Sequence, residues 1–262
     1  MLRLSAFLIL LVALVSCSPD SAASGEAGAS ECNPVEPVAA LLTDFDRWWD
    51  YHYNRVDLSV EFRAVDEHRE SISKDVFLQQ LTTGNYITVE LDCPDDQVYY
   101  RLYPIDAAEQ PAIAATLKSV AALERKRYRM EGMAMPAFDV TDLDGNKLTN
   151  AELADGYTVF KTWFIACKPC ITEMPELNKL VAEYAGREDV RFVSLALDDE
   201  GALRDFLEKT NFDYAVVPEQ RTLIQKELHL NVFPTHFVVG PDGKLLKVVG
   251  KVDQLRNFLA TL

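Results

Sequence analysis

The sequence predicts an α/β fold for residues 133–262, with a central mixed sheet flanked by helices, preceded by a small α+β domain at 34–130. Three observations support this assignment. In the second half of the chain, short β-branched and aromatic runs alternate with helical segments, which is the pattern of a mainly βαβ core. An Asp-Gly turn at 241–243 predicts a hairpin between the last two strands. The run at 157–165 predicts a buried strand that delivers two closely spaced cysteines to the start of a helix.

Composition places the chain among globular proteins of one large or two ordinary domains. It has 262 residues, of which 48% are hydrophobic and 10% aromatic, so it can bury a substantial core. The formal net charge of −15 at pH 7 repels phosphate backbones and anionic lipid headgroups. The charge therefore argues against nucleic acid as a partner.

The first 16 residues have the pattern of an export signal. Arg3 supplies the positive start, and residues 4–15 form an apolar segment too short to span a bilayer as a stable helix. A small residue and then Cys17 follow, an arrangement that resembles the lipobox of bacterial lipoproteins; the alternative is an ordinary signal peptide followed by an incidental cysteine. The lipobox implies that Cys17 carries lipid and anchors the chain to a bacterial membrane, facing the periplasm. Ser18 favours the outer membrane under the enterobacterial sorting rule.

A flexible tether is predicted at 17–33, because residues 18–30 are mainly Ser, Ala and Gly and cannot bury enough surface to fold. The domain that follows contains no evident catalytic constellation, and its role stays unassigned. Its predicted elements are a helix at 35–49, a strand at 56–65, a helix at 73–81 with a serine cap, strands at 86–91 and 98–103, and a helix at 107–129.

The second domain, at 133–262, is predicted to alternate strands and helices after an initial hairpin near 138–147. Its predicted strands lie at 157–165, 190–197, 214–217, 235–239 and 244–249, and its helices at 168–185, 201–210, 219–229 and 253–261.

Five cysteines divide into three groups. If Cys17 is lipidated, the close pair Cys167 and Cys170 is the reactive candidate, which leaves Cys32 and Cys93. These two either form a structural disulfide or remain separate thiols, and the sequence leaves both readings open.

Several features around the close pair occur together in one order. Trp163 lies four residues before Cys167, Pro175 lies five residues after Cys170, and Phe-Pro234-Thr stands at the start of a later strand. With the hairpin before the main strand and the Asp-Gly hairpin near the end, the chain resembles the thioredoxin superfamily. It is most similar to the TlpA and ResA-like branch of extracytoplasmic thiol-disulfide oxidoreductases, over about half of its length.

The resemblance implies roles for the residues of the Cys-x-x-Cys motif. Cys167 would attack as a thiolate stabilised by a helix N-terminus, and Cys170 would resolve the mixed disulfide. Lys168 adds a nearby positive charge, and Pro169 suits the first helical turn because it has no N–H to lose. The alternatives for this pair are a buried structural disulfide or half of a zinc site.

Other positions carry the resemblance less directly. Pro234 is similar to the cis proline that lies opposite the dithiol in the superfamily, and Phe233 would present an apolar surface to substrate. Glu173 matches a glutamate that takes or relays the proton of the second cysteine, although a solvated glutamate is the alternative. Two positions depart from the usual thioredoxin pattern: Ala166 stands where Trp is common, and Lys161 stands where a buried acid is common.

The sequence thus predicts a protein disulfide reductase whose only redox group is the cysteine pair, with no bound cofactor and no metal. The resemblance implies protein substrates with cysteines or disulfides and a membrane electron donor of the DsbD or CcdA type. One alternative is a thioredoxin-like copper chaperone that uses His236 as a ligand. The other is a thiol peroxidase, which is disfavoured because Phe164 stands where a peroxidase usually has Thr.

Overall fold

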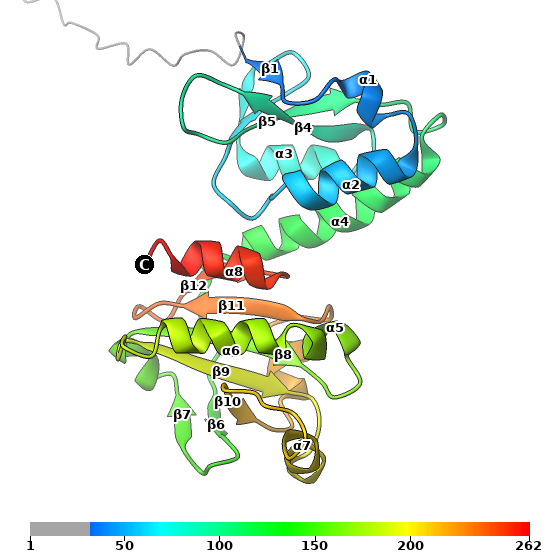
Figure 1. Ribbon diagram of the computed structural model, residues 1–262. Helices are drawn as coiled ribbons and strands as arrows, with labels where there is room; N and C mark the ends of the chain where they lie inside the picture. The colour runs from blue at the N-terminus through cyan, green and yellow to red at the C-terminus, as the bar shows by residue number, and fades with distance from the viewer. Residues whose placement is uncertain (1–31) are drawn as a thin grey trace, which may run out of the picture.

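The computed structural model describes residues 32–262, which form two five-stranded sheets, each accompanied by helices (Figure 1). The predicted export signal, Cys17 and nearly all of the tether at 17–33 lie outside the described residues. Within 32–262, none of the helices combines the length and the apolar character that crossing a membrane requires.

The first sheet has the strand order β1-β4-β5-β2-β3 and is antiparallel except for the β2 and β5 pair. Its strands are β1 (Asn33–Pro34), β2 (Arg63–Val65), β3 (Ser71–Ile72), β4 (Tyr86–Asp92) and β5 (Tyr99–Pro104). Its helices are α1 (Val38–Leu41), α2 (Phe45–Arg55), α3 (Lys74–Leu81) and α4 (Pro111–Met130).

Two sequence predictions in this half are wrong, and side-chain hydrogen bonds explain both. The helix expected at 35–49 is divided, because the Asp44 carboxylate accepts a hydrogen bond from the Arg47 amide at 2.8 Å and starts α2 afresh. The strand expected at 56–65 is a strand only over its last three residues. Upstream of them, Asp57 accepts hydrogen bonds from both the amide and the hydroxyl of Ser59, which forms a turn instead.

A disulfide joins Cys32 to Cys93, with the two Cα atoms 4.7 Å apart. The pairing follows from strand register, because Asn33 lies opposite Asp92 and each cysteine is the neighbour of one of these residues. Of the two arrangements that the sequence left open, the structure has the bonded one. The bond closes a loop with a sequence separation of 61 and fixes a strand of only two residues to the sheet.

Removing this disulfide is expected to lower the free energy of unfolding by about 4 kcal/mol, the loop-entropy value for a loop of this length. The measurement is denaturant unfolding of the Cys32→Ser/Cys93→Ser variant, which leaves the second cysteine pair intact. The single variant Cys93→Ser should lose about the same stability, because either change breaks the bond. Unfolding curves that coincide with the wild type would contradict this expectation.

The second sheet has the order β10-β9-β8-β11-β12. Strands β8, β9 and β10 run parallel, and β11 and β12 run antiparallel to their neighbours, which gives the mixed sheet that the sequence predicts. The strands are β8 (Tyr157–Trp163), β9 (Val190–Ala196), β10 (Ala215–Val217), β11 (Thr235–Val239) and β12 (Leu245–Val249), preceded by the hairpin of β6 (Asp139–Thr141) and β7 (Lys147–Thr149).

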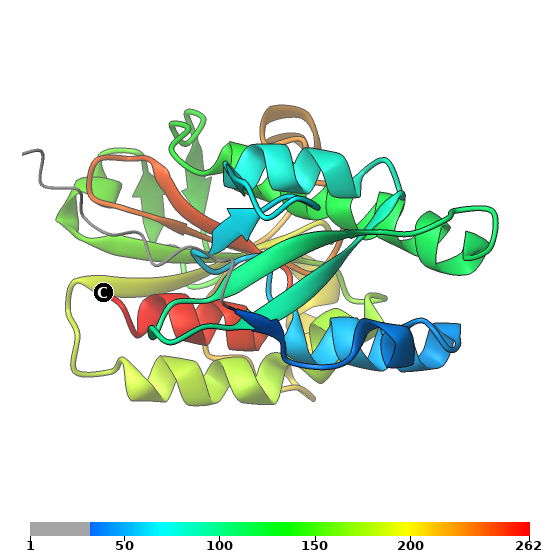
Figure 2. The same cartoon turned by 90° about the horizontal axis from the view of Figure 1, so that it is seen from above.

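The helical segments of this half are η1 (Glu152–Asp155), α5 (Lys168–Thr172), α6 (Met174–Glu183), α7 (Glu200–Leu207), η2 (Thr222–Glu227) and α8 (Val252–Leu259). The single helix expected at 168–185 is divided at Glu173, because Pro175 has no N–H to donate to the carbonyl four residues earlier. The helix expected at 219–229 is a six-residue π-helical segment. Figures 1 and 2 both show α8, in red, lying beside α6, and Arg256 of α8 forms an ion pair with Glu183 of α6.

Helix α4 joins the two halves of the molecule, since it belongs to the first and packs against the second (Figure 1). Lys126 donates a hydrogen bond to the carbonyl of His229. Arg127 is buried, and its guanidinium lies so close to Gly250 that a Cβ at this position would collide with it. A residue other than glycine at 250 would therefore force the Arg127 guanidinium out of its buried position.

Candidate active site

The two cysteines of the Cys-x-x-Cys motif lie just beyond the end of β8, the central strand of the second sheet. They are joined by a disulfide, with Cα atoms 5.3 Å apart. Cys167 is 5% exposed and Cys170 is fully buried, so an incoming partner reaches Cys167 first. The structure therefore gives the two sulfurs the unequal accessibility that an attacking and a resolving cysteine require.

Cys167 occupies the N-cap of α5, and its sulfur accepts a hydrogen bond from the Cys170 amide at 3.3 Å. The amide of Cys167 itself donates a hydrogen bond to the Phe164 carbonyl at 3.0 Å, which fixes the turn between β8 and α5. A helix N-terminus presents amide groups and a partial positive charge, both of which favour a thiolate over a thiol. Pro169 stands in the first turn, as expected, and Lys168 is exposed beside it.

The peptide bond between Phe233 and Pro234 is cis, which is the isomer that the resemblance implies. Phe233 packs edge-on against Phe164, with ring centroids 5.4 Å apart. Both rings contact the apolar cluster that contains the two cysteines. The backbone of this loop is held by Thr162, whose hydroxyl donates to the Thr235 carbonyl at 3.2 Å.

Trp163 lies behind the dithiol and is fully buried. Its ring contacts Phe206 and Phe212, with centroid distances of 5.8 and 5.7 Å. Its carbonyl accepts a hydrogen bond from the Leu197 amide at 3.1 Å. Trp163 therefore supports the site by packing the end of β8 and is not part of the surface that meets substrate.

Three ionisable side chains meet beneath the dithiol, and we refer to Lys161, Glu173 and His236 as the charge cluster. Lys161 and His236 are directly opposite each other on the adjacent strands β8 and β11, so both side chains project from the same face of the sheet. Glu173 reaches them from the joint between α5 and α6. All three are buried: Lys161 and His236 completely, and the Glu173 side chain to all but 14%.

Contacts within the charge cluster connect it to the second cysteine. The Lys161 ammonium forms an ion pair with Oε1 of Glu173 and also donates to the Cys170 carbonyl at 3.1 Å. Nε2 of His236 lies 3.2 Å from the same Oε1 atom. The Phe212 ring lies 6.0 Å from the ammonium and helps to exclude water. A buried lysine thus bridges the backbone carbonyl of Cys170 and the Glu173 carboxylate, three residues later.

Burial and pairing set the protonation of the charge cluster. Burial acts to raise the pKa of Glu173, but the nearby His236 imidazole and Lys161 ammonium outweigh it, so the pKa is lowered and the carboxylate stays ionised. Burial lowers the pKa of Lys161, and Glu173 offsets part of this effect. Burial also lowers the pKa of His236, against the pull of Glu173, so the imidazole is neutral at neutral pH.

The charge cluster changes three sequence interpretations. The solvated alternative for Glu173 is wrong, because its carboxylate is largely buried and paired. Lys161, noted only as a departure from the usual pattern, is the partner of that carboxylate. His236, weighed as a copper ligand, is fully buried against Glu173. A lysine inside a buried strand signals that an acid must lie nearby, but the sequence does not show which one.

Comparison with known proteins agrees with this geometry. The profile of the AhpC/TSA family matches residues 132–248. A thiol-disulfide oxidoreductase ResA from Bacillus cereus is 31% identical over 132 residues, which span 49% of this chain and 76% of the relative. A second ResA, from Bacillus thuringiensis subsp. konkukian, is 29% identical over 136 residues, which span 51% of this chain and 78% of the relative.

The solved thioredoxin domain of a thiol-disulfide oxidoreductase from Bacteroides vulgatus superposes with a TM-score of 0.46 at 21% identity, covering 50% of this chain and 96% of that domain.

The second sheet with its dithiol and the matched sequences together define a redox protein of the thioredoxin superfamily. Within that superfamily the chain belongs to the ResA-like thiol-disulfide oxidoreductases, and it is an enzyme of thiol-disulfide exchange.

Proposed function

We propose that this chain is a lipid-anchored, extracytoplasmic reductase of protein disulfides. The observation that carries the proposal is the dithiol, in which Cys167 caps a helix, the buried Cys170 stands behind it, and the loop of Pro234 packs alongside. This arrangement leaves Cys167 the more accessible of the two cysteines and keeps the Cys170 sulfur within bonding distance of it. Substrates of this kind are proteins that carry a disulfide near the surface.

The proposed reaction is an exchange of disulfides in two steps. The Cys167 thiolate attacks one sulfur of the substrate disulfide, that bond breaks, and the released substrate thiolate takes a proton. The Cys170 thiolate then attacks the Cys167 sulfur, the mixed disulfide breaks, and the second substrate thiol leaves. The substrate gains two electrons, and the enzyme returns to the disulfide form present in the structure.

We assign Glu173 as the group that receives or relays the proton of Cys170. The pair with Lys161 holds the carboxylate close to the backbone of this cysteine, and the part of the side chain that remains exposed offers a path to solvent. Lys161 and His236 act through Glu173 and are positioning residues. They keep the carboxylate ionised and in place between rounds of exchange.

The compartment and the direction of electron flow are part of the same proposal. The disulfide between Cys32 and Cys93 supports an oxidising environment, where such bonds persist. In that environment, the electrons for reduction must come from elsewhere, and a membrane donor of the DsbD or CcdA type could supply them.

The proposed lipid anchor is at Cys17, and Ser18 favours the outer membrane. Palmitate labelling of the wild type and of Cys17→Ser tests the anchor; equal labelling of the two proteins would contradict it.

The reduction potential of the Cys167 and Cys170 couple tests the direction. We expect a value more negative than about −210 mV, because a reductase must hold its electrons less tightly than the surrounding oxidising pool. Equilibration with glutathione mixtures of defined ratio measures it. A value near about −120 mV, typical of a strong oxidant, would contradict the reductase. Rapid consumption of hydrogen peroxide would instead support the thiol peroxidase.

A further inference from the structure

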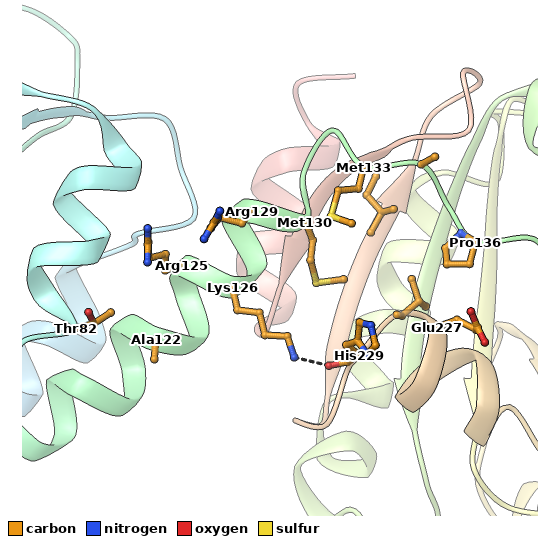
Figure 3. Close-up of a pocket in the computed structure, with 13 residues that line it drawn as sticks. Thr82, Ala122, Arg125, Lys126, Arg129, Met130, Met133, Pro136, Glu227 and His229 are labelled. Carbon is orange, nitrogen blue, oxygen red and sulfur yellow. Dashed lines mark hydrogen bonds between the residues drawn. The ribbon is translucent and has the colours of Figure 1, made fainter.

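A cavity of about 650 Å³ lies between α4, the connection at 131–136 and the end of η2 (Figure 3). Its buried wall is apolar and includes Met130, Leu228 and Leu245. Met133, which is 58% exposed, stands at its edge. This volume falls within the range of sites that bind small molecules or a few residues of a polypeptide.

Cationic side chains of α4 line this cavity, on a chain whose net charge is −15. Arg125 is paired with Asp75, with Nε 2.9 Å from Oδ1. Lys126 donates a hydrogen bond to the backbone carbonyl of His229, and this uncharged partner does not neutralise the ammonium. Arg129 is exposed, and its guanidinium forms neither a hydrogen bond nor an ion pair with another of the described residues 32–262. With one acidic side chain, Glu227, on the opposite wall, the cavity combines an apolar surface with excess positive charge (Figure 3).

A second, smaller cavity lies next to the first along α4, on the side of the cis-proline loop. Lys126 and Met130 also line this second cavity of about 80 Å³, whose other wall includes Asn231, Val232 and Thr235. These three residues flank the cis proline of the active-site loop, and Val232 is exposed. Lys126 is bonded to the start of the same loop, at His229 (Figure 3). A polypeptide that contacts the cis-proline loop therefore lies within reach of the cationic cavity.

We propose that this cavity docks an extended segment of the protein substrate that carries both carboxylates and apolar side chains. The inference rests on the disulfide exchange proposed above. Charge complementarity selects acidic segments over basic ones, and the flexible side chains of Met130 and Met133 accommodate apolar groups of different shapes. A polypeptide is favoured over a small free acid because the cationic cavity shares Lys126 and Met130 with the second cavity, which borders the cis-proline loop, so a segment bound at that loop is long enough to reach both.

Arg129→Glu in the full chain, purified in detergent, tests the docking site. The substrates are a short peptide disulfide with a Leu-Glu repeat beside its cysteine, the matching Leu-Lys peptide, and hydroxyethyl disulfide. We expect the wild type to have a lower KM for the Leu-Glu peptide than for the Leu-Lys peptide. In the variant, the KM for the Leu-Glu peptide should be about tenfold higher, with kcat unchanged. The KM for hydroxyethyl disulfide should be the same in both proteins. Added salt should weaken the preference of the wild type, because the attraction lies at the surface.

Lys118→Glu is the matched control, since this exposed lysine of the same helix undergoes the same change of charge but lines neither cavity. It should leave the KM for the Leu-Glu peptide unchanged. An equal effect of both variants, or equal KM values of the wild type for the two peptides, would overturn the docking site. Laurate serves as a probe for a small acid. If laurate raises the melting temperature of the wild type but not of Arg129→Glu, and does not inhibit turnover of the peptide, the cavity binds a small acid and the docking site is overturned.

The same assay separates the two proposals. Turnover of hydroxyethyl disulfide without selection between the peptides would reject the docking site and keep the exchange reaction. No turnover of hydroxyethyl disulfide by the wild type would reject the exchange reaction, and the docking site with it.

Discussion

Replacement of Cys170 by Ala is expected to leave the enzyme covalently attached to its substrates through Cys167. The first step needs only the Cys167 thiolate, whose helix N-terminal position the variant keeps. The second step needs the sulfur that the variant lacks, so the mixed disulfide has no internal route to resolution. Turnover should fall by at least about 1,000-fold, the scale on which loss of a covalent catalytic group acts. Non-reducing gel electrophoresis followed by mass spectrometry measures the adducts.

Two further variants make this result specific. Cys167→Ala should lose turnover equally but form no adduct, because Cys170 is fully buried. Cys32→Ser/Cys93→Ser should retain turnover, because that disulfide belongs to the first sheet. Adducts of similar yield in Cys167→Ala and Cys170→Ala would contradict the assigned roles of the two sulfurs.

Replacement of Lys161 by Met is expected to lower the free energy of unfolding by about 3 kcal/mol, because it leaves the Glu173 carboxylate buried without its cation. Chemical denaturation at pH 7 measures the change. The double variant Lys161→Met/Glu173→Gln should recover most of this loss, since it removes the buried charge together with its partner. A double variant that is less stable than Lys161→Met would show that the pair is not the cause.

Lys161→Met should also alter the pH dependence of stability and exchange. In the wild type the pKa of Glu173 is lowered, so its contribution to stability is present at neutral pH and is lost as the pH falls through that pKa. Without the Lys161 ammonium, one of the two partners that lower this pKa is lost, so burial counts for more and the pKa of Glu173 rises relative to the wild type. The variant then gains relative stability as the pH falls, and its deficit against the wild type shrinks. Exchange at pH 7 should slow about tenfold, with the rate profile displaced to higher pH.

Lys247→Met distinguishes a specific effect on the site from general destabilisation. Lys247 is a buried lysine on β12 whose ammonium lies 3.2 Å from Glu131, in a second buried ion pair of the same type. Its replacement should reduce stability by a similar amount. The pH profile of exchange should not change, because this pair does not contact the dithiol or the charge cluster. A displaced profile in Lys247→Met would remove the role assigned to Lys161.

Local patterns in the sequence predict much of this structure. The alternation of strands and helices in 133–262, the serine cap of α3 and the position of the Cys-x-x-Cys motif all depend on neighbouring residues. The predictions that are wrong depend on competition between local signals. At 56–65 the alternating pattern favours a strand, but hydrogen bonds from Ser59 to Asp57 favour a turn and prevail.

Contacts of the charge cluster between distant parts of the chain could not be predicted from the sequence. Glu173 is separated from Lys161 by 12 positions, and His236 reaches them only through the register of β8 against β11. The cationic cavity likewise exists only because α4 packs against the second sheet. A sequence shows that a buried lysine requires an acid, but the partner is chosen when the sheet forms.

The disulfide at Cys32 has a mechanical consequence for a chain held by its N-terminal end. Tension from that end would enter the described residues at Cys32, and β1, which begins at the next residue, is only two residues long and pairs with β4 alone. The disulfide to Cys93 would transmit this force to the end of β4, which is paired with a strand on each side. With the proposed lipid anchor, tension on the chain would thus enter through the first sheet, whereas the dithiol lies in the second.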